Sequence, residues 1–284
     1  MVKIVGDTTS GLSESLAEKY AIPIIPQIII FGEESYLESV EITYDTFMQK
    51  LKTATQLPKT AAPPPELFAE VFERFAPTAE PIVCVLPSAI VSGTVRSATV
   101  GLQMALERGA ENLDVRIIDT NLIASPVATL LRLAAEWAEQ GESADTIEAR
   151  VKEMSARGKI YFLVDTLKYL AMGGRIGGAA ALLGSVLQVK PVLTFKEGRI
   201  DTLEKVRTHK RAIDRLKQLV VDQIAPGDQG YLSIMHAAAE EQAQDLVVYF
   251  REELGLDDIP VRAVPPAVVT HGGPGVLGVG FFTE

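Results

Sequence analysis

The sequence predicts an α/β protein that has an N-terminal, mostly parallel sheet flanked by helices, followed by a C-terminal α+β domain. In the first half, short apolar runs alternate with amphipathic helices, which is typical of a parallel sheet with helices on both faces. In the second half, two extended runs flank Glu197-Gly198, which favours a hairpin turn and antiparallel strands. We place the boundary near Arg157-Gly158, which gives domains of residues 1–157 and 158–284.

The elements of the first domain follow from apolar spacing and from capping residues. Strands are expected at residues 3–5, 24–31, 82–86 and 115–118. Helices are expected at residues 13–20, after the cap Thr43, after Pro64-Pro65, after the cap Ser92, and from Ser125 until Gly141 ends the helix.

The second domain is expected to mix strands and helices. Strands are expected at residues 160–164, 192–195, 200–206, 231–235 and 261–264. A short helical turn ended by Gly173-Gly174 should precede a small-residue helix at 179–187. Further helices are expected after the cap Thr208 and over residues 240–254.

Composition excludes several classes of protein. The chain carries 37 acidic and 27 basic residues, and it has no basic stripe, so nucleic acid is not an expected partner. The single cysteine, Cys84, lies in an apolar run and is interpreted as a small core residue. The longest apolar stretch, residues 22–31, is interrupted by prolines and is too short to span a bilayer. We therefore expect a soluble cytoplasmic protein without a transmembrane segment.

Glycine-rich and hydroxyl-bearing segments carry the candidate chemistry. Arg175 stands between the pairs Gly173-Gly174 and Gly177-Gly178, beside helix ends that can offer free N–H groups to an anion. A tight helix–helix corner with a solvated arginine would explain the same pattern. His271, one of three histidines, begins the glycine-rich segment of residues 271–278, which is expected to form a turn.

Four segments taken together, in this order, resemble the DegV family of bacterial lipid-binding proteins. They are Lys59-Thr60-Ala61-Ala62-Pro63, Ser92-Gly93-Thr94, the segment at 164–178 and the segment at 271–278. The start at residues 4–10, and the run 190–194 leading to 205–208, fit the family as well. The resemblance covers residues 3–282.

The resemblance implies a single long-chain fatty acid held in a buried tunnel between the two domains. The implied carboxylate ligands are Thr60, Ser92 and His271, with Arg175 nearby as the cation. Two hydroxyls and an imidazole can each donate to a carboxylate oxygen, and a guanidinium supplies the compensating charge. No cofactor, no metal and no catalytic residue are implied, so we expect a lipid-binding protein and not an enzyme.

The candidate site has simpler explanations as well. The usual Thr-Ser-Gln-Pro of the family reads Thr-Ala-Ala-Pro here, so Ala61 and Ala62 lack the polar groups found there. Thr60 would also fit as a plain loop hydroxyl, and Ser92 as a helix cap alone. The other two histidines, His209 and His236, are interpreted as structural or solvated.

The resemblance also implies a partner. The family member whose role is best understood presents its fatty acid to a separate ATP-binding kinase subunit, which forms an acyl phosphate. The sequence agrees in lacking a phosphate-binding Gly-x-x-x-x-Gly-Lys-Ser/Thr loop and a kinase catalytic set. A basic cluster is a hypothetical docking site for that subunit: Lys205, Arg207, Lys210 and Arg211.

Alternative functions are an acyl hydrolase and a plain lipid carrier. The hydrolase would use Ser92 as nucleophile, His271 as base and Asp7 as orienting acid, but Ser92 lacks the Gly-x-Ser-x-Gly elbow. Phosphotransfer on histidine is disfavoured because no histidine precedes His209. Dinucleotide binding is disfavoured because the glycines around Arg175 do not match Gly-x-Gly-x-x-Gly.

Overall fold

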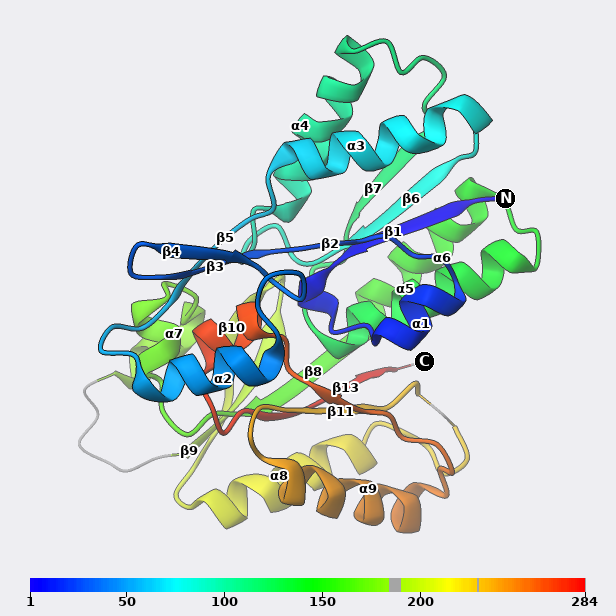
Figure 1. Ribbon diagram of the computed structural model, residues 1–284. Coiled ribbons are helices and arrows are strands. Elements are labelled where there is room, and N and C mark those ends of the chain that lie inside the picture. Colours follow the sequence, from blue (N-terminus) through cyan, green and yellow to red (C-terminus); the bar gives the residue numbers. More distant parts are fainter. Residues whose placement is uncertain (184–189, 229, 284) are drawn as a thin grey trace. The chain divides into compact units, whose positions relative to one another are not determined.

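The computed structural model describes residues 1–183, 190–228 and 230–283 (Figure 1). The chain divides into two compact units. The first comprises residues 1–156 and 265–267, and the second comprises residues 157–264 and 268–284. Residues 265–267, which include the start of the last helix, belong to the first unit although they lie far along the sequence.

The first unit contains a four-stranded, fully parallel sheet, as predicted. The strand order is β2-β1-β6-β7, formed by Ile24–Ile25, Lys3–Asp7, Ile82–Leu86 and Val115–Asp119. A second, antiparallel sheet has the order β4-β3-β5, formed by Glu34–Leu37, Ile28–Phe31 and Lys59–Ala61. The helices of this unit are α1 (Glu14–Lys19), α2 (Tyr44–Thr53), α3 (Pro65–Phe75), α4 (Thr94–Glu107), α5 (Ser125–Glu139) and α6 (Ala144–Arg157).

Helices cover both faces of the parallel sheet, as Figure 1 shows for α3 and α4 on one side and α5 on the other. Successive side chains along each strand point to opposite faces of the sheet, so each face has its own buried layer against the helices. Val5 and Cys84 pack with Phe68 and Phe72 of α3, all of them wholly buried or nearly so. Cys84 is confirmed as a core residue, and burial raises the pKa of its thiol.

Two predictions for the first unit were wrong in detail. Residues 24–31 do not form one strand, because Pro26 separates β2 from β3 and proline cannot donate to a strand ladder. Ser92 is not the cap of α4, because the helix begins at Thr94 and its cap position is Gly93. The strands β4 and β5 and the helix α6 were not predicted.

The second unit contains a six-stranded mixed sheet of order β10-β9-β8-β13-β11-β12. Its strands are Arg199–Val206, Lys190–Lys196, Gly158–Leu163, Leu277–Phe282, Ser233–His236 and Val261–Ala263. The pairs are antiparallel except for β11 with β12. Its helices are α7 (Lys168–Met172), α8 (His209–Val221), α9 (Glu240–Leu254) and most of α10 (Pro266–Gly272).

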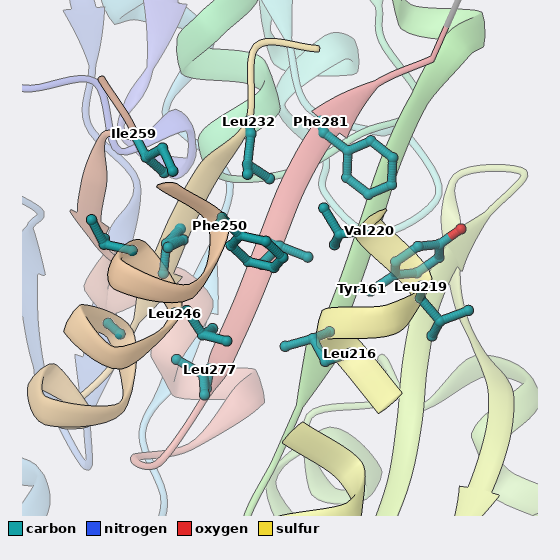
Figure 2. Close-up of a cluster of buried hydrophobic side chains, with 14 of the residues drawn as sticks. Tyr161, Leu216, Leu219, Val220, Leu232, Leu246, Phe250, Ile259, Leu277 and Phe281 are labelled. Atoms are coloured by element: carbon teal, nitrogen blue, oxygen red, sulfur yellow. The ribbon is translucent and has the colours of Figure 1, made fainter. Parts of the chain in front are cut away.

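Helices α8 and α9 bury their apolar sides against this sheet (Figure 2). Phe250 of α9 and Leu277 and Phe281 of β13 are wholly buried, and Phe281 makes an edge-on ring contact with Tyr161 at 5.6 Å between centroids. The predicted hairpin is confirmed, because β9 and β10 join at Glu197 and Gly198, which both have positive φ.

Two further predictions required correction here. The helix expected at 179–187 is a shorter 3-10 helix, Gly177–Leu182, followed by extended backbone at Leu183, and residues 184–187 lie outside the described residues. His271 does not belong to a glycine turn, because it lies in the last turn of α10. The central strand β13 was missed since its glycines disguise a strand that is buried throughout.

Candidate functional site

In the first unit, Thr60 and Ser92 lie on neighbouring segments. Thr60 is half-buried in β5, where it pairs with Ile29 of β3. Ser92 is half-buried in the turn between β6 and α4. The two segments touch, because a Cβ placed on Gly93 would lie 3.1 Å from the Cβ of Ala62. The fold therefore brings together two hydroxyls that the sequence separates by about thirty residues.

A buried polar network extends behind Ser92. The Ser92 hydroxyl lies 2.8 Å from the Thr94 hydroxyl, which lies 2.9 Å from Oδ2 of Asp7. The side-chain amide of Gln27 donates to the same Oδ2 at 2.6 Å. The other oxygen of Asp7 accepts from the Thr9 hydroxyl at 2.6 Å. Gln27 and Thr94 were not predicted as site residues, because the sequence shows them only as an amide and a hydroxyl beside apolar runs.

Two acids of the first unit are buried close to one another. Burial raises the pKa of Asp7, although the hydrogen bonds from Thr9, Thr94 and Gln27 act in the opposite direction. Burial also raises the pKa of Glu38 to about 7, and the charge of Asp7 adds to that shift. Glu38 accepts hydrogen bonds from the Thr8 hydroxyl and from the Ala267 N–H, the latter at 2.8 Å. Both acids therefore have a raised proton affinity.

In the second unit, Arg175 and His271 lie close to each other around Gly173. Helix α7 ends at Met172 with Gly173 as its C-cap, and Gly174 has the left-handed backbone that ends a helix, as predicted. The guanidinium of Arg175 turns back and donates to the Gly173 carbonyl at 2.8 Å. A Cβ on Gly173 would lie only 2.2 Å from Nδ1 of His271. Glycine at 173 thus leaves the space that the imidazole occupies.

Glycines also allow the turn after α10 to lie against the segment that leads to Arg175. A Cβ on Gly273 would lie 2.5 Å from the ring of Tyr169, and one on Gly275 would lie 2.1 Å from the carboxylate of Asp165. Both glycines have φ above +80°, a region that residues with a Cβ rarely adopt. The two glycine-rich motifs of the sequence therefore form one packed corner in the second unit.

The electrostatics of this corner suit an anion. Burial lowers the pKa of His271 to about 4, and the positive charge of Arg175 contributes in the same direction. At neutral pH the imidazole is neutral, so it carries one N–H donor, while Arg175 carries the charge. Such a pair can donate to an anionic oxygen and compensate its charge.

The remaining histidines have structural contacts. Nε2 of His236 lies 2.8 Å from the carboxylate of Glu240, and the ring accepts from the Ala239 N–H. His209 lies 3.3 Å from the side-chain oxygen of Gln242. Among the residues that the structure describes, no group of three metal-ligating side chains is found, and no helix is long and apolar enough to cross a membrane.

The basic cluster forms an exposed surface on the second unit. Lys205 lies near the end of β10 and Arg207 directly follows that strand. Lys210 and Arg211 lie in the first turn of α8. The first turn of α8 has no acidic residue. Cations at a helix N-terminus oppose the helix dipole, so folding alone does not favour this arrangement.

Comparisons with known proteins find relatives that match nearly the whole length of this chain. A DegV domain-containing protein of Streptomyces coelicolor is 38% identical over 280 residues, which cover 98% of this chain and 97% of the relative. The solved structure of DegV from Bacillus subtilis, described as a fatty acid binding protein, is 28% identical with a TM-score of 0.88 and covers 100% of this chain and 99% of its own.

A stearic acid-binding protein of known structure from Eubacterium ventriosum is 27% identical, with a TM-score of 0.89 and coverage of 100% and 98%. The family model described as "Uncharacterised protein, DegV family COG1307" matches residues 1–284. The whole chain therefore belongs to the DegV family.

Proposed function

We propose that this protein binds one long-chain fatty acid and presents its carboxylate to a separate, ATP-dependent kinase subunit in the cytoplasm, which forms the acyl phosphate. The observation that carries the proposal is the pairing of donors in each unit: the hydroxyls of Thr60 and Ser92 in one, and Arg175 with neutral His271 in the other. Members of the family with solved structures bind fatty acids, one of them stearic acid.

The donor chemistry fits a carboxylate. An ionised carboxylate offers only acceptors, and all four side chains can donate. Each hydrogen bond to a charged group contributes about 1.5–3 kcal/mol, which offsets the cost of removing the carboxylate from water. The acyl chain supplies most of the affinity, at about 0.8 kcal/mol for each buried methylene.

Removing one donor from each unit tests the carboxylate site. We expect Ser92→Ala and His271→Ala each to weaken fatty acid binding about tenfold, because each loses one charge-assisted hydrogen bond. Native mass spectrometry of the purified protein, followed by extraction of the released lipid, measures bound fatty acid per chain.

Thr99→Ala and His209→Gln are the matched controls for this test. Thr99 is exposed on α4 and donates only within its own helix, and His209 contacts Gln242. Wild-type protein that carries no fatty acid and binds none when it is added would contradict the proposed function. Equal loss in controls and site variants would contradict the assignment of these donors.

Charge reversal in the basic cluster tests the kinase partner. We expect Arg207→Glu to lower acyl phosphate formation by the kinase subunit on the order of tenfold, because complementary charge speeds association. The fatty acid content should stay unchanged, since the exposed Arg207 is not among the proposed carboxylate ligands.

Arg199→Glu is the control, because Arg199 is exposed at the start of β10, whereas the exposed Arg207 follows the end of that strand. Unchanged acyl phosphate formation with the Arg207→Glu protein would rule out docking through this cluster. Fatty acid binding by the wild-type protein, without acyl phosphate formation by any kinase subunit, would favour the plain carrier.

A further inference from the structure

Asp7 ends the first strand of the parallel sheet, wholly buried, at the inner end of a chain of hydroxyls. Its Oδ2 lies 2.9 Å from the Thr94 hydroxyl, and that hydroxyl lies 2.8 Å from the Ser92 hydroxyl. Thr94 is also wholly buried, whereas Ser92 is half-buried. The chain thus runs from a buried acid to a candidate ligand of the fatty acid.

The direction of the hydrogen bonds in this chain depends on the proton of Asp7. Each hydroxyl has one proton to donate. The Gln27 amide donates to the Thr94 hydroxyl at 2.7 Å and fills one of its two lone pairs. When Asp7 is ionised, Thr94 donates its proton to Oδ2 and its other lone pair accepts the proton of Ser92. Ser92 then has only lone pairs to offer to a ligand.

The reverse order holds when Asp7 carries a proton. Asp7 then donates to Thr94, Thr94 donates to Ser92, and Ser92 directs its own proton outward. A fatty acid carboxylate accepts hydrogen bonds and donates none, so it matches only this second arrangement.

We propose that Asp7 is a positioning residue that sets the donor direction of Ser92, so that binding of a carboxylate is coupled to uptake of one proton by Asp7. This inference rests on the carboxylate site proposed above. The balance is simple: the Asp7 carboxylate takes one proton from solvent, two hydroxyl hydrogen bonds reverse, and the ligand enters and stays ionised.

The surroundings of Asp7 favour proton uptake. The neutral groups that face Asp7 are Thr9, Gln27 and Thr94. The acid Glu38 is also close, and the negative charges of the two acids repel each other. Burial raises the pKa of Asp7, in the direction that the coupling requires.

Calorimetric titration of the delipidated full chain with oleic acid, at submicellar concentration, tests the coupling. Titrations in two buffers of different ionisation enthalpy give the number of protons taken up per fatty acid bound. We expect uptake of one proton by the wild type in mildly alkaline buffer, and an affinity that falls about tenfold per pH unit there.

Asp7→Asn is the decisive variant, because an amide takes up no proton in this pH range. We expect it to bind oleic acid without proton uptake and with an affinity that no longer depends on pH. Thr94→Val, which removes the middle hydroxyl, should also lose the uptake, and Thr94→Ser should restore it.

His271→Gln locates the proton. Uptake that disappears in His271→Gln and persists in Asp7→Asn would place the proton on the imidazole and overturn the inference. Wild-type binding without uptake would overturn it as well, while leaving the proposed function intact. Wild-type protein that binds no oleic acid would instead contradict the proposed function itself.

Discussion

Replacing Gly173 with alanine is expected to weaken fatty acid binding about 10- to 100-fold while leaving the protein folded. The added Cβ would lie 2.2 Å from Nδ1 of His271, so the imidazole must move. The backbone at Gly173 has φ −77°, which alanine adopts without strain. The carbonyl of the same residue holds the guanidinium of Arg175 at 2.8 Å. Alanine keeps this carbonyl, so the methyl group displaces one proposed donor, His271, and the loss of its hydrogen bond costs about 1.5–3 kcal/mol.

Gly174→Ala is the matched control for this prediction. Gly174 has φ +69°, and a Cβ there would meet nothing within 4 Å. This variant should lose about 1 kcal/mol of stability through backbone strain and keep its affinity. Fatty acid content by native mass spectrometry and melting temperature by circular dichroism separate the two effects. Equal affinities of the two variants would show that the position of His271 does not matter for binding.

The sequence predicted the parallel sheet because the strands of a buried sheet are nearly continuous apolar runs, as Ile82–Leu86 is. It did not predict β5 or β13. Lys59–Ala61 is only three residues long, and Leu277–Phe282 contains two glycines, so neither gives a periodic signal. Their assignment depends on the strands beside them, which one sequence does not reveal.

The candidate site was predicted as a set of residues and not as an arrangement. Ser92 was identified from its motif, but its link to Asp7 through the Thr94 hydroxyl depends on the meeting of β1 with the start of α4. His271 was assigned to a turn because three glycines follow within four residues, although α10 continues through Gly272. Glu38 was overlooked because it lies among other acids, Glu33, Glu34 and Glu41, and such runs usually form a solvated surface.

Burial of Glu38 predicts that the first unit becomes less stable as the pH rises. Its side chain is 0% exposed, and burial raises its pKa from 4.5 to about 7. The native state therefore keeps a proton that the unfolded state has already lost between these values. Stability is fully present below about pH 4.5, falls as the pH rises through about 7, and the loss is on the order of 3 kcal/mol.

Glu38→Gln should remove this loss, because the neutral amide imitates the protonated acid and still accepts from the Ala267 N–H in the first turn of α10. Above pH 7 the variant should exceed the wild type in unfolding free energy, on the order of 3 kcal/mol, and the two should converge in acid. Denaturant titration followed by Trp137 fluorescence measures this, since the chain's one tryptophan lies in α5 of the same unit.

Glu34→Gln and Glu38→Ala give the comparison its controls. Glu34 is exposed, and hydrogen bonds from Tyr36 and Lys50 lower its pKa, so its substitution should not flatten the pH profile. Glu38→Ala removes the acceptor of the Thr8 hydroxyl and the Ala267 N–H, and it should cost about 1–3 kcal/mol at every pH for each buried donor left unpaired. A difference in unfolding free energy between Glu38→Gln and the wild type that stays constant from acid to alkaline pH would show that Glu38 does not retain its proton in the native fold.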